Sequence, residues 1–188
     1  FEAHLSGDPR LSVLFAPGSS NTVIVGMPNG STSDTYVGTD GVTVPGVTDR
    51  HVYAQTHPAL RGKDVPMVFQ TYAEVEFLKA EAAIRGWISS SAKEHYDKGV
   101  TAAMKMLKQL YPASTAITDA EISAYLAGPG AYDASKGWEM AMNEYWKATF
   151  LNEYEAYANW RRTGYPTLTP TKHPNSCLLY TSDAADDK

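Results

Sequence analysis

The chain has 188 residues, of which 43% are hydrophobic and 20% are charged, and its formal net charge is −5. This composition is typical of a globular protein that is long enough to bury one good core. The negative charge argues against nucleic acid as the main partner, because phosphate binding requires a basic patch. No run of apolar residues approaches the roughly 18 that a membrane-spanning helix requires.

Both ends of the sequence are unlike the ends of a mature protein. The chain begins at Phe1 without an initiator methionine or a signal segment, which predicts that Phe1 is an internal position of a longer protein. The stretch CLLYTSDAADDK (177–188) resembles the in-frame translation of a transposase adaptor used in sequencing libraries. We therefore expect one domain over residues 1–176 and expect residues 177–188 to lie outside its fold. A genuine acidic tail is the alternative.

The first third of the chain, up to Pro66, is rich in Gly, Pro, Ser, Thr and Asn and has short β-branched runs such as NTVIVG (21–26). This pattern predicts loops with short strands or extended segments, and not a sheet-based domain. The stretch GDPRL (7–11) predicts a turn, because Pro9 fixes its φ angle and the Asp8 side chain can bond the backbone ahead of it.

Helical periodicity begins after Pro66. Its apolar spacing and stop signals predict helices over residues 68–85, 91–110, 118–128, 133–149 and 152–162. Ser91 with Glu94, and Thr118 with Glu121, form capping-box patterns at the start of two of them. Helix–short loop–helix pairs of this length predict antiparallel hairpins. The expected fold class is therefore mostly α, with tetratricopeptide-like helical hairpins and a loop-rich, short-strand N-terminal third.

The first predicted helix places Glu74 and Glu81 on the face that it should bury. Buried carboxylates are normally paired, so we expect a structural ion network. Arg85 can serve Glu81 from four residues away. Arg161 of the last helix is the expected main partner of both carboxylates, and Arg162 is the runner-up, because an arginine fork can bond two carboxylates at once.

A glycosidase acid–base couple is the alternative role for this carboxylate pair. Positions seven apart on a helix are separated by about 10.5 Å of rise, whereas catalytic carboxyl groups lie roughly 5 to 9.5 Å apart. The opposite side of the helix, with Tyr72, Glu76 and Lys79, is expected to face solvent.

Aromatic side chains occur in two settings. Those that recur at helical spacing are expected in the core, and they are Trp138, Tyr145, Trp146, Tyr154, Tyr157 and Trp160. In the Gly/Pro-rich loops, tyrosines have polar neighbours suited to stacking on a sugar ring and bonding its hydroxyls. The predicted ligand-binding residues are Asn21, Asn29, Asp34, Tyr36, His51 and Tyr53. Ordinary loop packing is the alternative explanation for each of them.

Sequence motifs for enzymatic chemistry are not found. The five histidines form no metal-ligand spacing, and the single cysteine, Cys177, gives no disulfide, zinc or catalytic pattern. The chain also has no phosphate-binding loop and no G-x-S-x-G elbow. We therefore predict no enzyme, no catalytic residue, no metal and no cofactor.

Four segments carry a resemblance to a known family. In chain order they are DPRLSVLFAP, VGMPNG, PMVFQTYAEVEFLKAEAAIRGW and AYDASKGWEMAMNEYWKATFLNEYEAYANWRRTGYPTLTP. Together they resemble segments of the SusD/RagB-like nutrient-binding outer-membrane lipoproteins, over Asp8 to Pro170.

The resemblance implies a mostly helical fold with tetratricopeptide-like hairpins, of which residues 1–176 would be the C-terminal part. It implies a full-length protein anchored by lipid on the outside of the outer membrane of a Gram-negative bacterium, although the anchor itself is not in this sequence. Such proteins capture oligosaccharides or peptides and deliver them to a SusC-type TonB-dependent transporter.

Two other functions are alternative hypotheses for this sequence. A helical-repeat scaffold that binds only proteins would not need the Gly/Pro-rich first third. A glycoside hydrolase would require activity that depends on Glu74 or Glu81.

Overall fold

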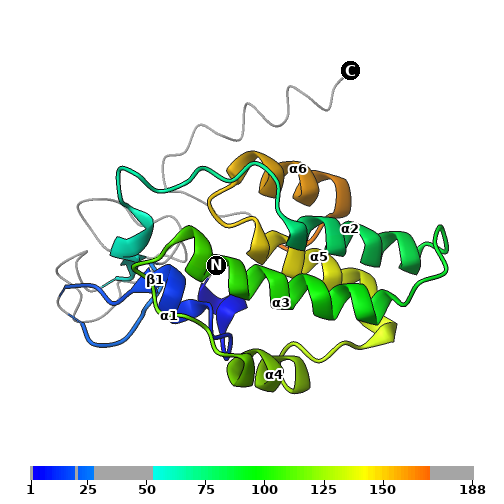
Figure 1. Ribbon diagram of the computed structural model, residues 1–188, viewed down its shortest axis with the longest axis horizontal. Coiled ribbons are helices and arrows are strands. Elements are labelled where there is room, and N and C mark those ends of the chain that lie inside the picture. Colours follow the sequence, from blue (N-terminus) through cyan, green and yellow to red (C-terminus); the bar gives the residue numbers. More distant parts are fainter. Residues whose placement is uncertain (1, 20, 28–52, 170–188) are drawn as a thin grey trace. The chain divides into compact units, whose positions relative to one another are not determined.

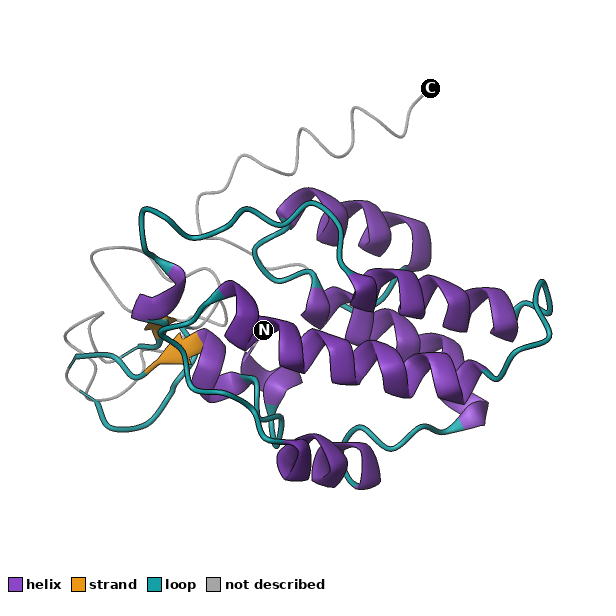
Figure 2. Ribbon diagram, in the orientation of Figure 1, coloured by secondary structure: helices purple, strands orange, loops and turns teal. Residues whose placement is uncertain are grey.

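The computed structural model of the protein describes residues 2–19, 21–27 and 53–169. The chain divides into two compact units, one of Phe1–Ala16 with Thr56–Leu168 and the other of Pro17–Gln55 with Thr169–Lys188. All the described helices belong to the first unit (Figures 1 and 2). The described strands are two residues long, so the predicted fold class, mostly α with helical hairpins, is confirmed.

The centre of the first unit is an antiparallel hairpin of α2 (Tyr72–Ile84) and α3 (Ala92–Leu110), shown in Figure 1. Thr71 and Ser91 cap these helices, since each side-chain oxygen accepts a hydrogen bond from the backbone N–H three residues ahead. The first helix begins later than predicted, because Thr71 is extended, with φ −124° and ψ 158°.

Three further helices of nine or more residues belong to the unit: α4 (Asp119–Ala127), α5 (Gly137–Ala148) and α6 (Glu153–Thr163). Thr118 and Glu121 form the predicted reciprocal capping box at the start of α4. A 3-10 turn, η4 (Ala134–Lys136), precedes α5, and Gly164 ends α6 in the left-handed conformation, with φ 75°. In Figure 1, α4 and α6 lie on opposite sides of the layer formed by α2, α3 and α5.

The parts of the first unit that precede Pro66 contain short helical turns that are not predicted from the sequence. These are η1 (Glu2–Leu5), α1 (Leu11–Leu14) and η3 (Pro58–Leu60). The strands β1 (Phe15–Ala16) and β2 (Gln55–Thr56) form a two-stranded sheet. The predicted turn at residues 7–11 is present, because Asp8 Oδ1 accepts a hydrogen bond of 3.0 Å from Arg10 N.

The core of the first unit consists of two clusters of buried side chains. The larger is built from α2, α3, α4 and α5 around Phe77, Val100, Met104 and Met142, each 0% exposed. The smaller joins the N-terminal turns to the end of α3, through Leu5, Val13, Leu14, Leu60, Leu107 and Tyr111. At Gly99, a Cβ atom would lie 2.7 Å from the ring of Phe77, so only glycine permits this approach of α3 to α2.

Candidate functional site

The structure describes two of the six loop residues predicted to bind a ligand. Asn21 is half-buried, and its Oδ1 accepts hydrogen bonds from the backbone N–H groups of Thr22 (2.8 Å) and Val23 (3.2 Å), so it shapes a turn. Tyr53 is 2% exposed, which contradicts its prediction as an exposed platform. This burial agrees with ordinary loop packing, the alternative explanation for Tyr53. The other four, Asn29, Asp34, Tyr36 and His51, lie outside the described residues.

Glu81 forms the centre of an ion network between α2 and α6. Its side chain is buried, and its Oε1 accepts hydrogen bonds from Arg162 Nη1 (2.6 Å) and from Arg85 Nε (2.9 Å). Burial raises the pKa of Glu81, but the hydrogen bonds and charges of Arg162 and Arg85 outweigh it and hold this pKa below its usual range. The carboxylate is therefore ionised and structural.

The prediction that Arg161 is the main partner of the two carboxylates is wrong. Arg161 is exposed, and its guanidinium lies over the ring of Tyr157, 5.8 Å from the centroid. The reason is the orientation of α6, which turns Glu155, Asn159 and Arg162 inward and its aromatic stripe outward. Arg162, the runner-up, therefore occupies the inner position.

Glu74 has no arginine partner among the described residues. It is 3% exposed, and among the described residues its Oε1 has no hydrogen-bond partner. Burial raises the pKa of Glu74, and hydrogen bonds from Thr71 offset this only in part. Thr71 and Glu74 have the T-x-x-E spacing of a capping box, which is the sequence signal for a role of Glu74 at the start of α2.

Glu76 was expected in solvent but is 2% exposed. His95 Nδ1 lies 2.6 Å from Glu76 Oε2, and Lys79 Nζ lies 2.9 Å from its Oε1. Burial raises the pKa of Glu76, but hydrogen bonds from His95 and Lys79 lower it to about 2. The α3 helix covers this side of α2, which periodicity in α2 alone could not show.

A second buried ionic cluster joins the N-terminal turn to α5. Arg10, 1% exposed, places Nη2 at 2.5 Å from Asp8 Oδ2 and at 2.6 Å from Glu144 Oε2. Tyr125 and Lys147 donate to the other oxygen of Glu144, at 2.6 and 2.7 Å. Burial raises the pKa of Glu144, but the charges of Arg10 and Lys147 lower it to about 2. The sequence gives no signal for this cluster, because Arg10 and Glu144 are 134 positions apart in the chain.

An open groove runs between the segment before α2 and the outer face of α3. It has a volume of about 670 Å³, with residues 67–73 along one wall and Ala102, Lys105, Met106, Gln109 and Leu110 along the other. A second hollow of about 410 Å³, lined by Asp97, Lys98 and Thr101, continues from it. Tyr72, Ala102 and Lys105 line both hollows.

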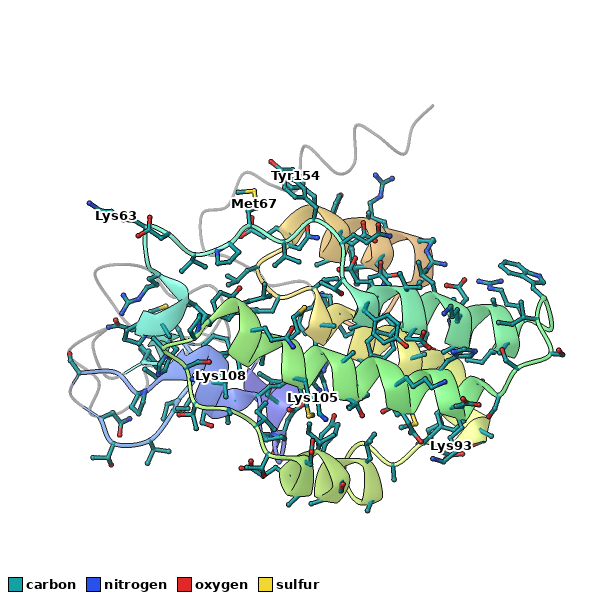
Figure 3. The ribbon with its side chains drawn as sticks, in the orientation of Figure 1. Lys63, Met67, Lys93, Lys105, Lys108 and Tyr154 are labelled. Carbon is teal, nitrogen blue, oxygen red and sulfur yellow. The ribbon has the colours of Figure 1, made fainter. Side chains whose placement is uncertain are left out.

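Tyr72 is the aromatic residue at the junction of the two hollows, and it is 59% exposed. Gln70, Gln109 and Thr101 offer amide and hydroxyl groups around it. Lys105 is held by Asp119 of α4, with 2.7 Å between Nζ and Oδ1, and Figure 3 shows it between α3 and α4. An exposed ring with amide and hydroxyl groups beside it suits a flat, polyhydroxylated ligand.

The described residues contain no group of three or more His, Cys, Asp or Glu side chains that could hold a metal ion. In the same part of the chain, no helix is long and apolar enough to cross a bilayer.

Comparison with known proteins identifies the family. A family described as SusD-like, starch-binding and associating with the outer membrane, matches residues 4–179. The chain belongs to the SusD-like family. No curated protein matches it.

Solved structures of SusD-like proteins have the same fold. A chitin-binding protein is 31% identical, with a TM-score of 0.76 over 94% of this chain and 39% of its own. A SusD-like protein of Bacteroidetes is 32% identical, with a TM-score of 0.60 over 72% of this chain and 30% of its own. A SusD homologue from Bacteroides fragilis is 25% identical, with a TM-score of 0.66 over 93% and 41%. The chain thus spans about two fifths or less of the length of these relatives.

Proposed function

We propose that the protein is part of a cell-surface nutrient-binding protein that captures oligosaccharides and delivers them to a SusC-type TonB-dependent transporter. The observation that carries this proposal is family membership over residues 4–179, joined to a matching fold in a chitin-binding relative. Peptides are the second class of ligand to be tested. The outer-membrane location and the lipid anchor of the full-length protein are part of the same proposal.

Two surfaces are candidates for sugar contact. One is the groove around Tyr72, where two hollows of about 670 and 410 Å³ share an exposed aromatic ring on which a sugar could stack. The other is the loop set Asn21, Asn29, Asp34, Tyr36 and His51, because recognition residues commonly lie on loops held by a rigid scaffold. Substitutions at Tyr72 and Tyr36 separate the two.

The test is isothermal titration of the chain with chitooligosaccharides, maltooligosaccharides and a mixed peptide library. We expect sugar binding that Tyr72→Ala or Tyr36→Ala weakens by about tenfold, equivalent to about 1.4 kcal/mol. Tyr154→Ala is the matched control, because Tyr154 is 91% exposed and does not line the groove. Binding of peptides alone would reassign the ligand, and binding of neither would contradict nutrient capture by this chain.

Delivery to a transporter is tested separately on the full-length protein. It should co-purify from outer membranes with a SusC-type barrel, and exchange of its lipidated cysteine should release it from the membrane. Co-purification with other proteins and no barrel would favour the scaffold alternative.

The buried position of Glu74 and Glu81 bears on the hydrolase alternative. The two carboxylates are 3% and 4% exposed, and two arginines hold Glu81. Neither lines the groove around Tyr72. Binding is therefore the function that the described geometry supports best.

A further inference from the structure

The α6 helix exposes its aromatic side. Tyr154 is 91% exposed and Tyr157 is 59% exposed, although the sequence analysis placed both in the core. Together with Ala158 and Arg161, they follow the i, i+3, i+4, i+7 spacing of a helix face that is usually buried. All four residues face solvent.

The inner side of α6 makes polar contacts with the rest of the first unit. Asn159, 2% exposed, accepts a hydrogen bond of 2.9 Å from Arg162 through its Oδ1. Glu155 Oε1 accepts a hydrogen bond of 2.6 Å from the Tyr145 hydroxyl. These contacts and the Glu81–Arg162 ion pair fix the rotation of α6, so its aromatic side cannot turn inward without breaking them.

The exposed aromatic side is continuous with neighbouring apolar residues. Leu151, 47% exposed, lies three residues before Tyr154, and Met67 and Phe69 are each 80% exposed. Asn152 Nδ2 donates to the backbone oxygen of Phe69 at 3.3 Å, which holds that segment beside the start of α6. Figure 3 shows Met67 and Tyr154 projecting from the same edge of the first unit. We call Met67, Phe69, Leu151, Tyr154 and Tyr157 the α6 face.

We propose that the α6 face is the docking surface for a helical hairpin of the SusD-like domain, supplied by the part of that domain that has no counterpart in these 188 residues. Relatives of the same fold have about three fifths or more of their length beyond the region that matches this chain. In proteins built from stacked helical hairpins, the apolar face of one hairpin is covered by the next. A large contiguous apolar surface also marks an interface in general.

The chemistry of the face defines its occupant. It requires an amphipathic helix pair that brings leucine-like or aromatic side chains against Tyr154 and Tyr157. It also requires a carboxylate for Arg161, which forms no ion pair with the described residues. Met67 and Phe69 also line the groove around Tyr72, so a hairpin docked on the α6 face would border that groove.

The test compares two contexts: the 188-residue chain alone, and the same chain joined to the unmatched part of the chitin-binding relative. The variant is the double substitution Tyr154→Ser with Tyr157→Ser. The matched control is Tyr72→Ser, because Tyr72 and Tyr157 are equally exposed, at 59%. The readouts are the melting temperature and amide hydrogen exchange of residues 153–163.

In the chain alone, both variants should leave the melting temperature unchanged within about 1 °C, since exposed substitutions have little effect. In the joined protein, exchange of residues 153–163 should slow by at least tenfold. There the double variant, but not Tyr72→Ser, should lower the melting temperature by about 2 °C or more and abolish the protection.

Three results would overturn the proposal. The first is equal destabilisation by the double variant in both contexts, which would mean that the chain covers the face itself. The second is unchanged exchange in the joined protein. The third is a dimer of the chain alone, found by sedimentation equilibrium and dissociated by the double variant, which would make a second copy the occupant. Sugar binding is not a readout, so the outcome is independent of the proposed function.

Discussion

Arg162 Nη1 lies 2.6 Å from Glu81 Oε1, and this ion pair joins α6 to α2 across 81 positions of the sequence. Arg162→Met should lower the free energy of unfolding by about 1 to 2 kcal/mol, because it leaves a buried carboxylate with one of its two arginines. The loss is smaller than for a fully buried pair, since the Arg162 side chain is 43% exposed and Arg85 remains. Urea denaturation at pH 7 measures it.

Arg161→Met is the control for this substitution, because the two arginines are adjacent on the same helix. Its effect should stay within about 0.5 kcal/mol, as is usual for exposed positions. A larger loss for Arg161→Met than for Arg162→Met would contradict the observed orientation of α6.

The Arg10–Glu144 pair should make the protein sensitive to acid. The folded pKa of Glu144 is about 2, below its usual value of 4.5, so the stability that it contributes is present above pH 4.5 and is lost as the pH falls toward 2. Arg10→Met should cost about 3 kcal/mol at pH 7, because Asp8 and Glu144 would remain buried and would keep only Lys147 as a cation among the described residues. Urea denaturation between pH 2 and 7 should show a weaker pH dependence in this variant. Lys98→Met, in the exposed Glu94–Lys98 pair, should leave the pH profile unchanged.

Ionised Glu74 should destabilise the folded protein, whereas ionised Glu144 stabilises it. Its folded pKa is raised, so the stability that its protonated form contributes is present at low pH and is lost as the pH rises through the folded pKa. Glu74→Gln should therefore raise the free energy of unfolding at pH 7 and leave it nearly unchanged at pH 4. Glu81→Gln should lower it at pH 7, since the pKa of Glu81 is shifted down. If both variants changed the free energy of unfolding at pH 7 in the same direction, Glu74 and Glu81 would not have the different electrostatic environments described here.

Gly99 should tolerate no side chain. A methyl group there would lie 2.7 Å from the Phe77 ring, which is fully buried and cannot move aside. Gly99→Ala should destabilise the protein by about 1 to 3 kcal/mol, although alanine is the better helix former. Thr101→Ala, two residues away in α3, gives no such contact and serves as the control in thermal melts.

The helices could be predicted from the sequence because their starts and stops are local. Thr118 with Glu121 and the left-handed Gly164 act within one turn, and both are found where the sequence indicates them. Which side of a helix is buried is a different kind of information. On α6 the aromatic stripe indicated burial, yet the buried residue is Asn159, because the partners of that side are charged and hydroxyl groups of α2 and α5.

The candidate site was predictable only in part for a related reason. The Tyr72 groove depends on the crossing of α3 past residues 67–73, which no single stretch of sequence specifies. The Arg10 cluster likewise joins positions 134 residues apart. The family could be predicted from the sequence because its motifs are contiguous stretches. The burial of the loop residue Tyr53 could not be predicted, because composition alone does not show whether a loop side chain is buried or exposed.

The polar contacts that Glu155, Asn159 and Arg162 make on the inner side of α6 affect the order in which the helices unfold. Neither core cluster contains a residue of α6 among the described residues, so this helix is held by oriented hydrogen bonds and contributes little apolar burial. Regions of that kind open as separate cooperative units at a lower free energy than the core. Amides of residues 153–163 should therefore exchange while those of α2 and α3 stay protected, and α6 should be the last helix to be secured when the chain folds.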